Sequence, residues 1–127
     1  MEARVMQALA AAGFDDVTPA QGRVFQRVGV HGTRLTDLAE QARISKQTAG
    51  FLVDQLERAG YVERVPDPTD ARARLVRVAP RGEAAVRAAR VVEAEVEAEW
   101  TQHLGGRDAE HLHRTLTRLR EITDSYA

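Results

Sequence analysis

The sequence predicts a mainly α-helical protein with one small β-hairpin and helices at both ends. Apolar residues recur three and four positions apart over most of the chain, which is the spacing of a buried helix face. Two short β-prone segments flank a polar, proline-containing stretch near the middle. The chain has 127 residues, 43% hydrophobic and 29% charged, a size and composition typical of one globular domain.

Two helices are predicted before residue 31. An alanine-rich segment over residues 3–12 is followed by Gly13, which suits the position just after a helix C-terminus. Thr18 and Pro19 then form a strong start signal, an N-cap residue followed by proline at the first helical position. We expect the second helix to run from about Pro19 to Val30.

Two further helices are predicted between residues 35 and 60, joined by a short turn over residues 41–44. The first begins at about Thr36, and the second begins after Ser45, which suits an N-cap. Gly60 ends the second helix. In both, the inward positions follow helical spacing: Leu35, Leu38, Ala39 and Ala42 in the first, and Ala49, Leu52, Val53 and Leu56 in the second.

The pattern then changes to two predicted strands, over residues 61–65 and 75–78. Between them, residues 66–74 include two prolines, two aspartates and two arginines and nothing suited to a core. We therefore expect a two-stranded hairpin with a long, exposed polar tip. Three short helices followed by a hairpin form a winged helix-turn-helix, predicted here for residues 18–79.

The rest of the chain is predicted to be helical again. A long helix should run from Pro80 to about His103, broken by Gly105 and Gly106, and Asp108 should cap a last helix. The apolar stripe of that helix has no partner within the winged part, so a second copy of the chain is the expected one. Its members are Leu112, Leu116, Leu119, Ile122 and Tyr126.

We accordingly predict one domain over residues 1–127, with residues 1–13 and 80–127 as dimerisation helices. The chain has no cysteine, which excludes disulfides and thiolate chemistry. It has no apolar run near the roughly 18 residues of a membrane helix and no signal-peptide pattern at its start, so a cytoplasmic protein without membrane contact is expected.

Neither catalysis nor a metal site is expected. The sequence contains no glycine-rich phosphate loop, G-x-S-x-G or H-E-x-x-H motif, so we predict that it is not an enzyme and needs no cofactor. His111 and His113 are two positions apart and would point about 200° apart on a helix, too far to share one ion.

The charge balance is almost neutral. The formal net charge is −1 and the sequence pI is about 6.4, which argues mildly against nucleic acid, although the local field matters more. Residues 91–99 contain four glutamates and no basic residue. We expect this acidity to lie on the dimer helix, away from any DNA.

The first turn of the fourth predicted helix carries groups suited to DNA. Ser45 and Thr48 supply hydroxyls, Lys46 a charge for phosphate, and Gln47 an amide able to contact adenine with two hydrogen bonds. The helix N-terminus adds free backbone N–H groups. Taken alone, these four residues favour an ordinary capped surface helix, and it is the hairpin that shifts the interpretation towards DNA.

Several segments resemble the MarR family of transcription regulators, continuously from about Thr18 to Gly82. The resemblance implies a homodimer that binds double-stranded DNA at a pseudo-palindromic operator, with the recognition helix in the major groove and the wing in the minor groove. It further implies a repressor that responds to a small aromatic or lipophilic effector. The matching segments are residues 35–39, 44–48, 52–57, 60–64 and 67–76.

The same resemblance assigns roles in the hairpin. Asp70 and Arg72 occupy the family's Asp-x-Arg positions, which implies that Arg72 enters the minor groove and that Asp70 braces it. Arg74 either contacts phosphate or only flanks the strand. Family effectors bind between the winged part and the dimer helices, where the candidates are Phe25, Val28, Trp100 and the helix beginning near Ala3, with core packing as the alternative for each.

Three features depart from the family pattern. Gly50 and Phe51 stand where many members have a polar or basic pair. Gly50 would allow close approach of the backbone to DNA, and Phe51 would either contact a thymine methyl or pack under the wing. Ala71 replaces a second wing arginine, and the N-terminal segment is short. The nearly neutral charge, Gly50 with Phe51, and Ala71 motivate an alternative function, a winged-helix protein-interaction module without operator binding.

Overall fold

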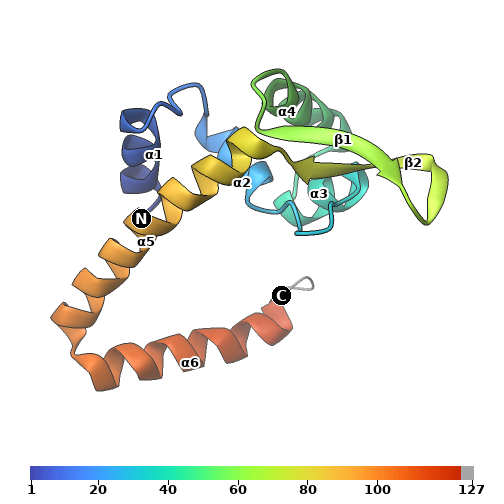
Figure 1. Cartoon of the computed structure of the whole chain (residues 1–127). Coiled ribbons are helices and arrows are strands. Elements are labelled where there is room, and N and C mark those ends of the chain that lie inside the picture. The colour runs from blue at the N-terminus through green and yellow to red at the C-terminus, as the bar shows by residue number, and fades with distance from the viewer. Residues whose placement is uncertain (124–127) are drawn as a thin grey trace.

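The computed structural model describes residues 1–123, and its two-stranded sheet is antiparallel. Figure 1 shows the elements along the chain. The structure confirms the predicted fold class, mainly α-helical with a small β-hairpin. The described elements are α1 (Glu2–Ala11), α2 (Pro19–Phe25), α3 (Leu35–Ala42), α4 (Lys46–Arg58), β1 (Val62–Asp67), β2 (Asp70–Val78), α5 (Pro80–Leu104) and α6 (Gly106–Thr123).

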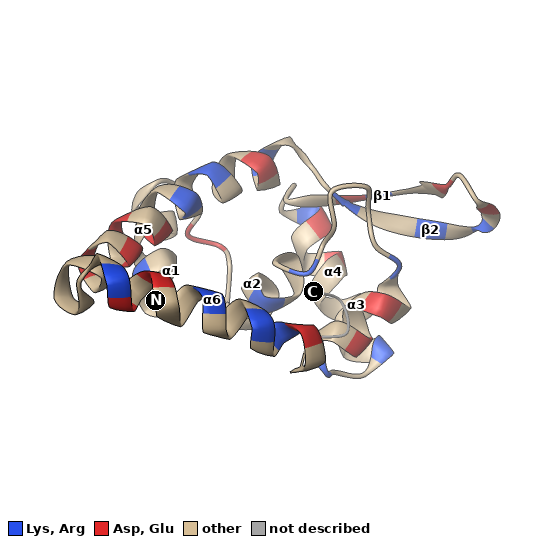
Figure 2. Ribbon diagram, turned by 90° about the horizontal axis from the view of Figure 1, so that it is seen from below, with Lys and Arg blue, Asp and Glu red and all other residues tan. Residues whose placement is uncertain are grey.

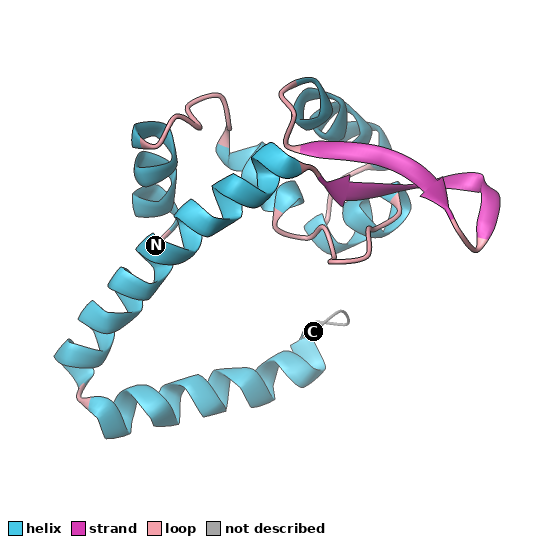
Figure 3. Cartoon of the chain, viewed as in Figure 1, coloured by secondary structure: helices cyan, strands magenta, loops and turns pink. Residues whose placement is uncertain are grey.

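The elements form two regions. Helices α2, α3 and α4 and the β1–β2 hairpin, the wing, gather at one end of the molecule, and Figure 3 shows the wing projecting beyond the helices. Helix α5 leads away from this region and α6 turns back from its far end, so that the two form an open V (Figure 1). Helix α1 packs against α5. None of these described helices is both long and apolar enough to cross a bilayer.

The core lies where α2, α3, α4 and the base of the wing meet. Its most buried side chains come from each of these elements, and Leu9 of α1 and Ala85 of α5 extend it towards the outer helices. All eight inward positions predicted for α3 and α4 are at least half-buried. Buried among them are Leu38, Ala39, Ala49, Val53 and Leu56; half-buried are Leu35, Ala42 and Leu52.

Helix α2 is shorter than predicted, because it ends at Phe25 and not near Val30. Its capping box at Thr18 is present, so the predicted start is correct. After Phe25 the backbone tightens, with N–H groups bonding to carbonyls three residues back. Gly32 then takes a φ of +90°, which allows the next residue, Thr33, to pair with the wing.

Two other helix starts also differ from prediction. Helix α3 begins at Leu35 after Arg34, whose extended backbone occupies the N-cap position, so Thr36 lies within the first turn. Helix α6 begins at Gly106, which places Asp108 inside its first turn, where its charge favours the helix dipole without capping it. Tyr126, predicted for the α6 stripe, lies outside the described residues.

The wing strands are longer than predicted, and the expected long tip is wrong. Pairing continues past Pro66, opposite Arg74, as far as Asp67 opposite Asp70, and a bulge lies between Pro66 and Asp67. Polar residues and prolines suggested a loop, but an exposed two-stranded hairpin keeps its outer faces in water and tolerates both residue types at an edge or bulge. The turn itself is therefore tight.

Candidate nucleic-acid interface

A tight turn sets the direction in which α4 leaves α3. Arg43 adopts a left-handed conformation with a φ of 57°, and the N–H of Ile44 donates to the Ala39 carbonyl oxygen at 3.0 Å. Ser45 then caps α4, because its Oγ accepts from the Thr48 N–H at 3.0 Å. The Ser45 hydroxyl donates to Thr48 Oγ1 at 2.8 Å. The start of α4 is thus a helix end capped by the Ser45 side chain.

The first turn of α4 presents its polar side chains to solvent. Ser45, Lys46, Gln47 and Thr48 are all exposed, whereas Ala49, the next residue, is buried. The two hydroxyls already serve the cap described above. Lys46 and Gln47 have no hydrogen bond or ion pair with any residue of the described chain, so both side chains are available to a ligand.

Gly50 and Phe51 occupy different environments. Gly50 is half-buried, and a Cβ at its position would lie 3.6 Å from Leu35 Cδ2, so this residue faces α3. Phe51 is 58% exposed. The alternative in which Phe51 packs under the wing is therefore wrong for the single chain, and its ring remains a surface group on α4.

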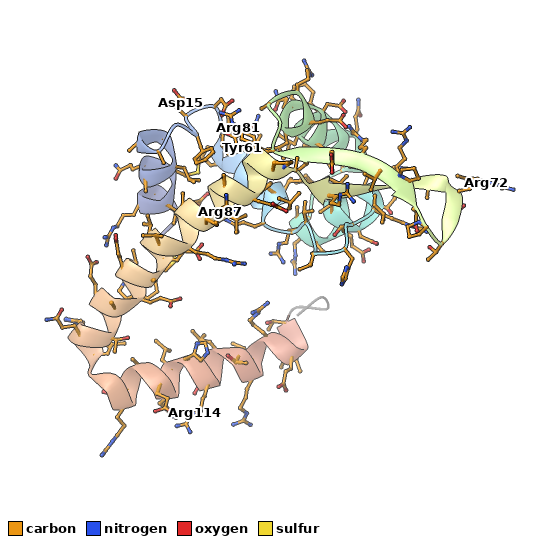
Figure 4. The ribbon with its side chains drawn as sticks, viewed as in Figure 1. Asp15, Tyr61, Arg72, Arg81, Arg87 and Arg114 are labelled. Carbon is orange, nitrogen blue, oxygen red and sulfur yellow. The ribbon has the colours of Figure 1, made fainter. Side chains whose placement is uncertain are left out.

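Arg72 lies at the far end of the wing. Figure 4 shows its side chain directed away from the helices. Asp70 Oδ1 accepts a hydrogen bond from the Arg72 backbone N–H at 3.0 Å, so Asp70 shapes the backbone at Arg72 and has no bond to its guanidinium. Arg74, two residues on, is also exposed.

Sequence reasoning missed an ion pair that fastens the wing to α3. Arg34 donates to Asp67 Oδ2 from Nε at 2.9 Å and from Nη2 at 2.7 Å. Asp67 Oδ1 accepts from the Thr69 N–H at 2.8 Å and the Thr69 hydroxyl at 2.7 Å. These bonds, first those from Thr69 and then those from Arg34, lower the pKa of Asp67 to about 2. Asp67 is buried despite its place near the wing turn.

The base of the wing has a second attachment through backbone groups. Thr33 and Val76 exchange two hydrogen bonds, at 2.9 and 2.8 Å, so the segment before α3 extends the sheet by one bridge. No sequence signal pointed to either attachment, because both depend on the register of the wing against a loop. Together they hold the wing beside the start of α4.

Most acidic side chains near this face are already paired. Asp54 and Glu57 each contact Arg64 at 2.8 Å, and Glu63 contacts Arg77 at 2.6 Å. In contrast, Lys46, Arg72 and Arg74 have no ion pair within residues 1–123. Figure 2 shows acidic residues gathered on the part of α5 farthest from the wing. The start of α4 and the wing therefore both carry positive charge that is not neutralised within the described chain.

A junction around the buried Tyr61 connects the winged region to α5. Tyr61, only 2% exposed, donates a short hydrogen bond from its hydroxyl to Asp16. Arg81 Nη1 donates to Asp16 Oδ2 at 2.9 Å and to the Ala59 carbonyl oxygen at 2.7 Å. The Arg81 guanidinium lies 4.4 Å from the centre of the Tyr61 ring, and Figure 4 shows the two side by side.

This junction shifts the pKa of two of its members. Burial, followed by the hydrogen bond to Asp16, raises the pKa of the Tyr61 hydroxyl. The same hydrogen bond, together with Arg81, lowers the pKa of Asp16. Both shifts favour a neutral tyrosine beside a charged carboxylate, so the junction is a stable polar contact at neutral pH.

A largely apolar cavity of about 520 Å³ lies between α1, α2, α5 and the winged core. Phe25, Val28 and the first helix α1, three of the four candidates for an effector cleft, line it, as does Tyr61 of the junction. Trp100 does not line it and is 52% exposed on α5. The assignment of Trp100 to this cleft is therefore wrong for the single chain, because α5 carries it beyond the winged core.

The described residues contain no group of three or more His, Cys, Asp or Glu side chains that could hold a metal ion. His111 and His113 are both exposed on α6.

Comparison with known proteins shows which family the winged region resembles. Residues 15–73 match the model of the MarR family. The transcriptional regulator Tm0710 from Thermotoga maritima is 25% identical, with 97% of this chain and 85% of that chain covered and a TM-score of 0.67. No curated protein sequence matches the chain significantly.

Two structures of MepR from S. aureus share the fold. A MepR variant bound to an oligodeoxyribonucleotide is 22% identical, with 97% of this chain and 89% of that chain covered and a TM-score of 0.65. MepR bound to ethidium bromide is 22% identical, with coverages of 97% and 88% and a TM-score of 0.70. The winged region thus matches the MarR family model, and the chain shares the fold of these winged-helix regulators over nearly its whole length.

Proposed function

We propose that this chain acts in the cytoplasm as a homodimeric transcription repressor that binds a pseudo-palindromic operator in double-stranded DNA. The proposal rests on two exposed elements, the capped first turn of α4 and the wing tip. The basic side chains Lys46 and Arg72 on them have no ion pair within residues 1–123. A recognition helix enters the major groove with its N-terminal residues, and an arginine at the wing tip suits a narrow minor groove.

Each candidate residue has a distinct role in this proposal. Lys46 contacts phosphate and Gln47 a base edge, while Ser45 and Thr48 hold the helix end and present hydroxyls. Arg72 enters the minor groove, and Asp70 fixes the backbone that carries it. On α4, Gly50 keeps the backbone close to α3 and the exposed Phe51 contacts a thymine methyl; on the wing, Arg74 contacts phosphate.

The outer helices support the homodimer. The apolar stripe of α6 has no partner within residues 1–123, and Leu112, Leu116, Leu119 and Ile122 are 47% to 85% exposed. Trp100 and Leu104 add exposed apolar surface on α5. Such a continuous apolar surface suits a second copy of the chain. Two winged regions roughly 34–36 Å apart would then reach successive major grooves on one side of the duplex.

The cavity lined by Phe25, Val28 and Tyr61 supports a ligand-responsive regulator. Its volume of about 520 Å³ lies in the range of small-molecule sites, and its largely apolar lining suits an aromatic or lipophilic effector. MepR, which shares this fold, is known in a structure bound to ethidium bromide, a flat aromatic cation. Occupation of the cavity would change how α1 and α5 pack on the winged region.

Selection of duplexes from a random DNA library by the purified chain tests the proposal. We expect a recovered motif with two inverted half-sites. Arg72→Ala should weaken binding to the recovered duplex, whereas Arg77→Ala, which removes an ion-paired arginine from the same strand, should not. Recovery of no motif, with no binding to mixed-sequence duplex either, would contradict DNA binding.

A protein-interaction module without operator binding is the second candidate. The exposure of Phe51 on α4 favours it, because an aromatic ring on an open surface suits a protein partner. Phe51→Ala distinguishes the two functions. In the regulator it changes base preference at one position of the half-site, while in the interaction module DNA selection recovers nothing for either protein.

A further inference from the structure

We propose that a groove between the wing and the start of α4 binds one phosphate of the DNA backbone, and that the Arg34–Asp67 pair holds the groove at the correct width. The inference rests on the proposed function and adds to it a phosphate site and a positioning residue. The groove has a volume of about 360 Å³. Its lining residues are Arg34, Leu35, Thr36, Lys46, Arg64, Ala73, Arg74 and Val76.

The lining of this wing groove is strongly biased towards positive charge. Four of its eight residues are basic and none is acidic. The basic residues come from four places in the chain: the N-cap of α3, the start of α4 and both wing strands. Such convergence from separate elements differs from a charged helix face, which would place its residues on one element. A single anion within the groove would be approached from several sides.

The paired and free cations in the groove have different roles. Arg64 is held by Asp54 and Glu57, and Arg34 is held by Asp67. Lys46 and Arg74 are exposed and have no ion pair within residues 1–123, so they are the two groups free to bind. A lysine supplies a compact charge and an arginine a planar set of donors, a combination suited to phosphate oxygens.

The Arg34–Asp67 pair neutralises a carboxylate that lies next to a residue lining the groove. One Asp67 oxygen accepts both bonds from Arg34, and the other accepts both bonds from Thr69. The carboxylate is therefore turned inward and buried. Its partner Arg34 precedes α3 and also lines the groove, so the pair ties the wing turn to the groove wall opposite.

This connection determines where Arg74 stands relative to Lys46. Arg34 is fixed to α3 through its own backbone at the N-cap, and α3 packs on α4. Asp67 is in β1, and Arg74 in β2 pairs with the neighbouring Pro66. Loss of the ion pair would let the wing turn move relative to α4 and separate the two free cations. Arg34 is thus a positioning residue for the phosphate site.

Asp67→Asn tests the positioning role, because general electrostatics and positioning of the wing predict opposite changes in DNA affinity. The substitution removes a negative charge near DNA, so general electrostatics predicts tighter binding. If the pair positions the wing, binding weakens, by about tenfold, the typical effect of losing a charged hydrogen bond. Glu40→Gln is the matched control, because it removes one exposed acidic group from α3 without breaking any contact described above. It should leave binding unchanged or slightly tighter.

Salt dependence tests the phosphate contact itself. Lys46→Ala and Arg74→Ala should each lower the slope of log K against log salt by about two, since a dimer carries two grooves and each contact contributes about 0.9. Both side chains are exposed, so these variants should fold normally. The losses should be similar on the selected duplex and on a mixed-sequence duplex, because a phosphate is present in every sequence. Arg77→Ala should leave the slope unchanged.

The outcomes separate this inference from the proposed function. If the wild-type protein binds neither duplex, both are overturned. If it binds, but Lys46→Ala and Arg74→Ala keep the wild-type slope, the phosphate site is wrong while the regulator stands. Tighter binding by Asp67→Asn overturns the positioning role of Arg34. An Arg34→Ala/Asp67→Asn double variant that binds no more weakly than Arg34→Ala alone supports that role.

Discussion

The attachment of α5 to the winged region depends on the absence of a side chain at Gly82. A Cβ at this position would lie 2.2 Å from the Tyr61 carbonyl oxygen, 2.9 Å from Val78 Cγ1 and 3.0 Å from Phe25 Cε2. The first of these distances is about 1 Å shorter than a normal carbon–oxygen contact, and backbone cannot rotate away as a flexible side chain would. Gly82→Ala therefore forces α5 and β1 apart.

The size of the effect follows from three contributions. Overpacking a tight site typically costs about 1–3 kcal/mol. Separation also strains the hydrogen bond from the Ala79 N–H to the same Tyr61 oxygen, now 2.9 Å long, which is worth about 1 kcal/mol. Replacing a helical glycine by alanine returns about 1 kcal/mol. We expect a net destabilisation of about 2 kcal/mol.

Thermal unfolding followed by circular dichroism measures this change. For a chain of this size about 2 kcal/mol corresponds to a Tm lower by roughly 6–10 °C, compared at equal protein concentration because dimerisation affects Tm. Gly22→Ala in α2 is the matched control. A Cβ there meets only Met6 Sδ, at 3.9 Å, so that variant should be as stable as the wild type or slightly more so. A Gly82→Ala protein with the stability of Gly22→Ala would refute the close packing.

Three further predictions concern the junction, the dimer and the wing. Tyr61→Phe should lower the free energy of unfolding by about 1–2 kcal/mol in denaturant titration, because Asp16 loses one donor but keeps Arg81. Leu116→Glu should convert the dimer to monomer in sedimentation at micromolar concentration, and a dimer that survives would exclude the α6 stripe from the interface. The Asp67 carboxyl should titrate by NMR near pH 2, below its ordinary value of 3.8. Its stabilising contribution is then complete above about pH 4 and is lost as the pH falls towards 2, and Asp67→Asn should flatten that part of the stability curve.

The helices could be predicted because their signals are local. Thr18 and Pro19 predicted the start of α2, Ser45 predicted the start of α4, and the spacing of Ala49 and Val53 predicted its buried face. A capping side chain acts within one turn of the chain, and a buried helix face repeats every three or four residues. Neither property requires knowledge of what lies across the core.

The wing attachments could not be predicted because they join residues far apart in sequence. Arg34 and Asp67 are separated by 33 positions, and their meeting depends on the bulge that sets the register at the wing turn. The residue types around Asp67 predicted an exposed loop, where aspartate commonly forms hydrogen bonds with nearby backbone groups. It does bond to Thr69, but burial and the second partner depend on the packed position of the wing.

Net charge was a poor guide to the DNA-facing surface for a related reason. Over residues 43–74 the numbers of basic and acidic residues are nearly equal, yet most of the acidic residues are ion-paired within the chain. Asp54 and Glu57 share Arg64, and Asp67 is turned inward. The net charge of the sequence counts these paired carboxylates equally with Lys46. A DNA phosphate, however, interacts mainly with charged groups that are exposed and unpaired.

The Tyr61 junction offers a route by which the proposed effector would act on the wing. Tyr61 lines the cavity, its hydroxyl bonds to Asp16 in the α1–α2 connection, and its carbonyl accepts from the Ala79 N–H just before α5. A ligand that displaced Tyr61 would therefore also displace the α1–α2 connection, the start of β1 or the start of α5. A packed interior adjusts by such small displacements of whole elements. Since β1 carries Asp67 at its other end, a ligand that moves Tyr61 alters the position of the wing, and with it the distance between Arg74 and Lys46.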